Sequence, residues 1–210
     1  RMNEHPILFT GEMVLAILDG RKTQTRRVIK PQPILMTSGI WYPSEVPGDS
    51  KNKTGLHYAN EKHMRKGMPI DFCPYGQPGD RLWVLESFLI DYEDGESSHG
   101  QRPPTVYYHA TDNETPWTKP GWKPSIYMPR WASRITLEIV NVRVERVQEI
   151  TDDDAIQEGV DRTNTSIPGY ARTRFINLWN SINAKRGFGW DANPWVWAIE
   201  FKRVDNNEPS

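Results

Sequence analysis

Ile135–Val147, with the sequence ITLEIVNVRVERV, is the stretch that decides the fold class. Apolar β-branched residues alternate with polar ones along it, which is the pattern of a strand that buries one face. The alternation slips by one residue at Ile139–Val140. A β-bulge or a bend at a barrel corner would return the apolar residues to one face. The sequence therefore predicts a long, irregular strand.

Shorter elements are expected on both sides of this strand. Strands are predicted at 7–9, 81–88, 105–110 and 195–201, the last almost wholly apolar and therefore central in its sheet. Helices are predicted after the capping residues Thr10 and Thr151, and a third near 170–183. Five or six strands, three short helices and no regular βαβ alternation favour an α+β, mainly β fold, in the form of a small, partly closed β-barrel with flanking helices.

Prolines divide the chain into two kinds of sequence. Of the 17 prolines, 13 lie between Pro31 and Pro129, together with Gly, Asn and Ser clusters. Long connections of this type are usually functional insertions. We therefore expect one domain over 1–205 with insertions at about 31–75 and 91–129, followed by a disordered tail at 206–210.

Composition excludes some classes of protein. The 210 residues contain no run of about 18 apolar residues, and the first residues lack the apolar core of a secretion signal, so a cytoplasmic protein without a membrane span is expected. The single cysteine, Cys73, excludes an internal disulfide. A net charge of -1 argues against a globally basic nucleic-acid coat, but not against a local basic groove. The oligomeric state leaves no signal in the sequence.

The most concentrated chemistry lies in Gly20–Arg27, GRKTQTRR. Residues 21–30 hold five cations and no anion, namely Arg21, Lys22, Arg26, Arg27 and Lys30. A solvated strand face is one explanation. The other is catalytic: an extended chain places Thr25 and Arg27 on one face, and a Lys22 amine with a depressed pKa would accept the Thr25 hydroxyl proton.

Two carboxylates also stand out. Glu158 ends a short helix beside Gly159, where the helix dipole disfavours an anion, so either a second use or simple exposure explains it. Glu86 shares a strand face with Leu82 and Val84. A carboxylate on an apolar face needs a cation, for which Lys22 and Arg27 are the nearest candidates in a barrel, unless Glu86 reaches water at the strand end.

Taken together, these segments resemble an ASCH domain, a family of PUA-like β-barrels. The resemblance rests on the Gly20–Arg27 turn, Pro78–Val84, the helix ending at Glu158–Gly159, and the final aromatic strand, and covers roughly 5–30, 76–90 and 130–203. The family motif G-x-K-x-x-E-x-R has Thr25 in place of its Glu here. This form, K-x-x-T-x-R, is similar to small bacterial ASCH amidohydrolases that deacylate N4-acetylcytidine. The whole sequence also resembles ASCH-like proteins of bacteriophages and prophages.

This resemblance implies a catalytic set of Lys22, Thr25 and Glu158 in a hydrolase of amide C–N bonds, without a metal or other cofactor. Its expected substrate is a modified cytosine nucleoside. For substrate binding we expect the residues Arg21, Arg27, Trp83, Glu86, Tyr107 and Trp131, the aromatic ones as a slot for the base or as simple core. The spacing of His57, His63, Asp71 and Cys73 does not match a structural zinc site.

A second class of function stays open. PUA-like barrels bind RNA, and lysines and arginines alternate with tryptophans over 117–131 in the way that single-stranded nucleic acid requires. The alternative prediction is therefore an RNA-binding or single-strand-binding module, with nuclease activity as a weaker variant.

Overall fold

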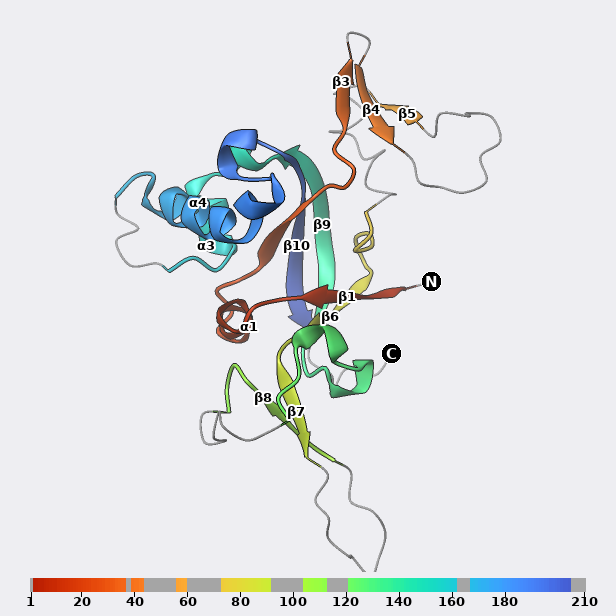
Figure 1. Ribbon diagram of the computed structural model, residues 1–210, viewed down its shortest axis with the longest axis vertical. Coiled ribbons are helices and arrows are strands. Elements are labelled where there is room, and N and C mark those ends of the chain that lie inside the picture. The colour runs from red at the N-terminus through yellow and green to blue at the C-terminus, as the bar shows by residue number, and fades with distance from the viewer. Residues whose placement is uncertain are drawn as a thin grey trace, which may run out of the picture.

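The central sheet has five strands in the order β1-β6-β9-β10-β2 (Figure 1). The computed structural model describes residues 2–36, 39–43, 56–59, 73–91, 104–112, 121–161 and 167–204. Strand β1 pairs in parallel with β6, and the other pairs are antiparallel. The expected α+β, mainly β class is confirmed. Within the described ranges the sheet does not close into the expected barrel, because β1 and β2 are its two edges.

The elements that the sequence predicted occur in the expected order, with boundaries shifted by a few residues, and further strands lie between them. The strands are β1 (Glu4–Leu8), β2 (Gln24–Val28), β3 (Ile34–Met36), β4 (Gly39–Pro43), β5 (Leu56–Ala59), β6 (Arg81–Leu85), β7 (Phe88–Asp91), β8 (Thr105–Tyr108), β9 (Thr136–Arg146) and β10 (Trp195–Val204). The helices are α1 (Gly11–Leu18), α3 (Asp152–Gln157) and α4 (Tyr170–Asn183), with 3-10 turns η2 (Ser125–Tyr127), η3 (Arg130–Ala132), η4 (Val147–Glu149), η5 (Ala184–Arg186) and η6 (Trp190–Ala192).

The predicted irregularity in the long strand is a β-bulge at Val140. Across β9 and β10, Glu200 pairs with Asn141 and Phe201 pairs with Ile139, so Val140 is the extra residue. Val140 is exposed, whereas Ile139 and Val142 on either side of it are buried in the main core. The bulge therefore restores one apolar face along β9, as the slip in the sequence pattern requires.

The two faces of the sheet carry separate apolar clusters. The main core contains residues from one face of β6, β9 and β10 together with α1, and the second cluster fills the space between the opposite face and α3 and α4. In β10 the alternation is direct, because Trp197 and Ile199 belong to the main core while Val196 belongs to the second cluster. Strand β2, at the sheet edge next to α3, therefore contacts both clusters.

The capping predictions for α1 and α3 are confirmed. The Thr10 hydroxyl accepts a hydrogen bond from Met13 N at 3.4 Å, and the Thr151 hydroxyl accepts one from Asp154 N. Gly159 follows α3 at φ +89°, a conformation that favours glycine and closes the helix. The caps place the end of α3 against the start of β2.

The regions expected as insertions contain small sheets of their own. Strands β3, β4 and β5 form a three-stranded sheet, and β7 pairs with β8 (Figure 1). The sequence pattern missed β3–β5 and merged β6 and β7 into one strand. The expected tail at 206–210 lies outside the described residues. None of the helices in the described ranges has the length and apolar character needed to cross a membrane.

Candidate active site

Lys22 lies at the junction of β2 and α3, with its ammonium group buried. Nζ donates three hydrogen bonds, to Gln24 O at 2.8 Å, Glu158 O at 2.8 Å and Glu158 Oε2 at 2.9 Å. Lys22 is 2% exposed and Glu158 5% exposed. Two of the three predicted catalytic residues are therefore in direct contact, although 136 positions separate them in the chain.

Backbone contacts align the two segments that carry this pair. Residues Lys22 and Glu158 form an antiparallel β-bridge, and Thr23 N donates to Gln157 O at 2.9 Å. Glu158 is the C-cap of α3, where the helix dipole disfavours a carboxylate. The Lys22 ammonium offsets that cost, which accounts for the unusual placement of Glu158.

Gly159 provides the space through which the Lys22 side chain passes. A Cβ at this position would lie 3.0 Å from Lys22 Cβ and 3.0 Å from Ala16 Cβ. With φ at +89°, any other residue would also be strained. Glycine is therefore needed here twice, to end α3 and to admit Lys22.

Arg26 holds the second oxygen of Glu158. Its NH1 lies 3.2 Å from Glu158 Oε1, while Glu158 Oε2 bonds to Lys22. Arg26 also pairs with Glu145 of β9 and with Asp154 of α3, and its guanidinium lies 6.0 Å from the Phe175 ring centre. Arg143 extends the network to Glu145, Asp154 and Glu200. Two cations of the basic run, Lys22 and Arg26, are thus buried and paired with carboxylates rather than lying on a solvated face.

In the sequence, Thr25 lies between two cations, Lys22 and Arg27, that share one aromatic neighbour. It is 3% exposed, and its partner in β10 is Ile199, so its side chain lies on the main-core face of the sheet. Arg27 occupies the same face two residues on. The Lys22 and Arg27 charges lie 5.5 Å and 5.1 Å from the centre of the Phe9 ring. The three hydrogen bonds of Lys22 Nζ go to Gln24 and Glu158, not to Thr25.

Arg27 carries a donor that the protein leaves unused. Its NH2 donates to Leu8 O at 2.5 Å, whereas its Nε is buried without a hydrogen-bond partner. Buried donors are normally satisfied, so an unused one on the strand face that carries Thr25 is unusual. Burial also lowers the pKa of Arg27, an effect that Tyr75 and Glu158 oppose.

Burial likewise lowers the pKa of Lys22. Loss of solvation disfavours the ammonium form and is the largest contribution, while Glu158 opposes it by its charge and hydrogen bond. The nearby charges of Arg27 and Arg26 lower the pKa further. This environment makes the neutral amine more accessible than in an exposed lysine.

Glu86 has a cationic partner, but not either of the two expected ones. Both of its oxygens accept hydrogen bonds from Arg134, at 2.9 Å each, and Glu86 is 2% exposed. The Arg134 guanidinium also stacks 3.9 Å from the centre of the Tyr108 ring. Arg134 is the last residue of the irregular segment 121–134. Spacing in the sequence did not indicate that this segment lies near Glu86 at the end of β6. Arg134 also donates to Thr111 Oγ1 at 2.9 Å, so Glu86 belongs to a group around Arg134 rather than to the Lys22 group.

The remaining candidates are dispersed over the surface and the sheet. Arg21 forms an ion pair with Asp19 at 2.9 Å. Trp83 alternates with the core residues Leu82 and Val84, so it lies on the opposite face, and Arg130 is 5.9 Å from its ring centre. Tyr107 pairs with Leu89 in the β7–β8 sheet. Trp131 is 58% exposed, which excludes the core position, one of the two alternatives expected for it.

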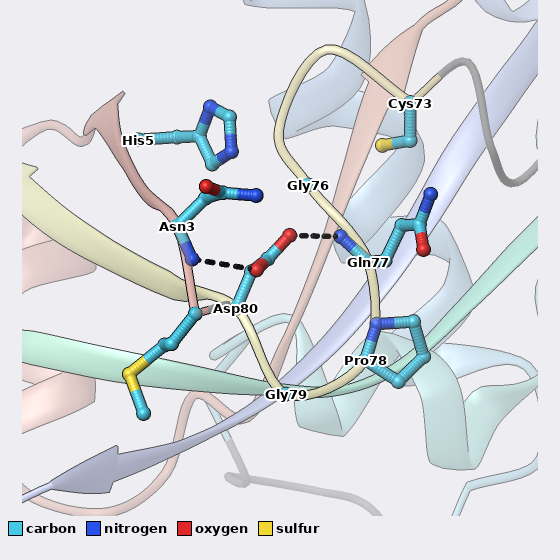
Figure 2. Close-up of a pocket in the computed structure, with 9 residues that line it drawn as sticks. Asn3, His5, Cys73, Gly76, Gln77, Pro78, Gly79 and Asp80 are labelled. Atoms are coloured by element: carbon cyan, nitrogen blue, oxygen red, sulfur yellow. Dashed lines mark hydrogen bonds between the residues drawn. The ribbon is translucent and has the colours of Figure 1, made fainter.

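A pocket at the 76–80 turn is separate from this group. Figure 2 shows Asp80 bridging the turn to the N-terminal segment, with hydrogen bonds from Asn3 N at 2.8 Å and Gln77 N at 3.0 Å. These two backbone donors lower the pKa of Asp80. His5 and Cys73 also line the pocket, and none of the predicted site residues does. Asp80 is fully engaged in shaping the turn.

No metal-binding cluster is found in the described part of the chain, taking groups of three or more His, Cys, Asp or Glu residues. Of the four residues considered for zinc, His63 and Asp71 lie outside the described ranges, and Cys73 is a buried free thiol. Burial raises the pKa of this thiol to about 11, so it is in its neutral form at ordinary pH.

Comparison with known proteins gives little guidance. No family model matches the chain, and no curated protein matches it. Among solved structures, it is similar to a protein from Enterococcus faecalis V583 described as a member of the family DUF984, with 10% sequence identity and a TM-score of 0.40. The match covers 100% of this chain and 86% of that one. Similarity at this level assigns neither a fold nor a function.

Two contributors to the Lys22 group were not singled out from the sequence. Arg26 was considered only as one of several cations close to Lys22 in the sequence, and Gly159 only as a helix stop. The signal that could have identified Arg26 is its position one residue from Thr25, on the opposite face of β2, which points it toward the acidic helix α3.

Proposed function

We propose that the protein is a metal-independent amidohydrolase that removes acyl groups from N4-acylated cytosine nucleosides. The observation that carries the proposal is the buried Lys22–Glu158 pair, 2.9 Å apart, which joins the end of α3 to the residues just before β2, the strand that bears Thr25. The sequence resemblance to ASCH amidohydrolases selects this pair together with Thr25 as the third residue. A PUA-like barrel is the fold that this resemblance implies, whereas the sheet formed by the described residues is open.

In the first half of the reaction Thr25 is the nucleophile. The neutral amine of Lys22 takes the proton from the Thr25 hydroxyl as its oxygen attacks the acyl carbonyl. A neutral amine has two N–H bonds for three acceptors, so one acceptor is released and the nitrogen lone pair is free to turn toward Thr25. The unused Nε–H of Arg27 is on the same strand face and would bind the oxyanion.

Attack by Thr25 on the acyl carbonyl gives a tetrahedral intermediate. Its collapse breaks the C–N bond. Lys22 returns the proton to the leaving exocyclic nitrogen, which releases cytidine and leaves the acyl group on Thr25. Water then attacks the acyl-Thr25 carbonyl, with Lys22 taking its proton and Glu158 stabilising the ammonium that forms. On breakdown the Lys22 ammonium returns this proton to the leaving Thr25 oxygen, which restores the hydroxyl and the neutral amine, and the carboxylic acid that is released ionises in water.

The test is to incubate the purified protein with N4-acetylcytidine and to measure the cytidine that is released. Thr25→Val removes the hydroxyl with little change in shape and should lower kcat/KM by about 10³-fold or more. Thr23→Val is the matched control, because Thr23 directly precedes β2 and its side chain is exposed. Absence of turnover by the wild-type protein, or full activity in Thr25→Val, would exclude the proposal.

A second candidate function, binding of single-stranded nucleic acid, is favoured by one surface. Tyr127 and Trp131 are 70% and 58% exposed, and they alternate with the exposed cations Lys123 and Arg130. Exposed aromatic rings beside cations are the elements with which proteins stack bases and contact phosphates. This surface is distinct from the basic run, in which Lys22 and Arg26 are buried.

Binding of a fluorescent single-stranded RNA, measured by anisotropy at increasing salt, tests this candidate. Trp131→Ala should weaken binding by about tenfold, the effect of losing one base stack. Ile126→Ala removes an exposed apolar residue of the same segment and should have little effect. Affinity that is independent of salt would argue against phosphate contacts.

A further inference from the structure

We propose that Arg26 is a positioning residue that fixes the Glu158 carboxylate and limits the negative charge that this carboxylate presents to Lys22. The catalytic consequence of this role rests on the proposed function, because it concerns the same Lys22 amine. Arg26 does not take part in the reaction itself. It acts through Glu158.

The geometry divides the Glu158 carboxylate between two cations. Oε2 accepts from Lys22 at 2.9 Å, and Oε1 lies 3.2 Å from Arg26 NH1. If Arg26 were absent, Oε1 would lose its cation and the whole charge of Glu158 would act on Lys22. A buried carboxylate bound to one cation stabilises that cation more strongly than one shared between two.

The contacts around Arg26 hold its side chain in one position. Its side chain is fully buried and forms ion pairs with Glu145 of β9 at 2.5 Å and with Asp154 of α3 at 3.2 Å. NH1 also donates to Gln24 Oε1 at 2.5 Å. These partners come from three elements, so the guanidinium cannot follow Glu158 if that side chain moves. Glu158 is instead held in place by Arg26.

The charges around Lys22 define which protonation state this arrangement favours. Glu158 faces Lys22 from the end of α3 and favours the ammonium, while Arg26 and Arg27 face it from β2 and disfavour it. Arg26 itself faces Glu145, Asp154 and Glu158. Sharing Glu158 with Arg26 therefore shifts Lys22 toward the neutral amine, the form that the proposed reaction requires of its base.

Titration of Lys22 by NMR tests this directly. Lysine labelled with ¹³C at Cε is incorporated, and the Lys22 signal is assigned by its loss in Lys22→Met. Arg26→Gln should raise the pKa of Lys22 by about one unit, the usual scale for removing a neighbouring like charge and freeing an opposite one. Arg143→Gln is the matched control, because Arg143 pairs with Glu145 and Asp154 but not with Glu158. An unchanged Lys22 pKa in Arg26→Gln, or an equal shift in both variants, would overturn the proposal.

Two further variants test whether the effect passes through Glu158. In a Glu158→Gln background, Arg26→Gln should shift the Lys22 pKa by less than half as much, and an undiminished shift would show that Arg26 acts directly and overturn the positioning role. If Arg26→Gln does not fold, Arg26→Lys serves instead. One ammonium cannot hold three carboxylates, so a smaller upward shift is expected, and no shift would overturn the proposal.

The titration of Lys22 does not depend on enzymatic turnover. It therefore tests the role of Arg26 separately from the proposed amidohydrolase activity. A chain without deacylase activity whose Lys22 pKa moves as expected would refute the amidohydrolase and support the role of Arg26. An active enzyme whose Lys22 pKa does not respond to Arg26→Gln would refute the role of Arg26 alone. In an active enzyme, the acidic limb of kcat/KM should move to higher pH in Arg26→Gln and stay in place in Arg143→Gln.

Discussion

Glu86 and Glu158 are both buried carboxylates with arginine partners, yet they are built differently. Glu86 binds one arginine, Arg134, with both oxygens at 2.9 Å, in the two-point geometry that matches a guanidinium to a carboxylate. Glu158 is divided between Arg26 and Lys22. The first pair is complete in itself, whereas the second includes an amine whose pKa is lowered by burial. A carboxylate with both oxygens bound to one guanidinium is typical of a structural ion pair. A carboxylate shared between Arg26 and Lys22 leaves the Lys22 amine able to gain or lose a proton.

The largest effect on stability is expected at the Glu86–Arg134 pair. Arg134→Met should lower the free energy of unfolding by about 3–5 kcal/mol, because it leaves the Glu86 charge buried without a partner. The double variant Arg134→Met/Glu86→Leu should recover much of this loss. Urea unfolding followed by tryptophan fluorescence measures both, and a cost below about 1 kcal/mol for the single variant would contradict the comparison.

A smaller loss is expected at Gly159, on the Glu158 side. Gly159→Ala places a Cβ 3.0 Å from both Lys22 and Ala16 at φ +89°, which should cost about 1–3 kcal/mol of unfolding free energy. Gly187→Ala is the control, since its φ is also positive but no atom lies within 4 Å of the added Cβ. If the two variants are equally destabilised, the contact with Lys22 contributes nothing beyond backbone strain.

Lys22 itself should matter less for stability than Arg134. Lys22→Met relieves the cost of burying an ammonium, and Glu158 keeps Arg26, so the unfolding free energy near neutral pH should change by no more than about 1.5 kcal/mol. Denaturant unfolding compared directly with Arg134→Met checks this order. A loss at Lys22 as large as that at Arg134 would break the comparison between the two carboxylates.

The pH dependence gives Lys22 a distinct signature. Its folded pKa lies below its ordinary value of 10.5, so between the two values the unfolded chain binds more protons than the folded one. Wild-type stability should therefore gain a contribution that rises with pH across this window. Unfolding curves at several pH values should show this rise in the wild type and lose it in Lys22→Met.

The smallest effect is expected at the cap of α3. Thr151→Ala removes the hydroxyl that accepts from Asp154 N and should cost about 1 kcal/mol. Because α3 carries Glu158 and not Glu86, hydrogen exchange should quicken at the end of α3 without quickening at β6 and β7. Equal quickening at both places would show that α3 does not open independently of the sheet.

Local sequence rules predicted the parts of this molecule that depend on neighbouring residues. The slip at Ile139–Val140 predicted the bulge, and Thr10 and Thr151 predicted the helix starts, because alternation and capping involve residues a few positions apart. The partner of Glu86 was missed, since Arg134 is 48 positions away and reaches it through an irregular loop. The role of Arg26 was missed for a related reason: its partners come from β9 and α3, and a charge count does not show which cations are buried.

The bridge between Lys22 and Glu158 also bears on self-association. Strand β2 is a sheet edge, and an edge with free backbone groups is a template for pairing with another chain. At Lys22 and Thr23 the end of α3 supplies hydrogen-bond partners to that backbone, just before β2 begins. The contact that assembles the candidate site therefore also pairs the backbone next to this edge, and loss of α3 would leave the Thr23 N–H unpaired.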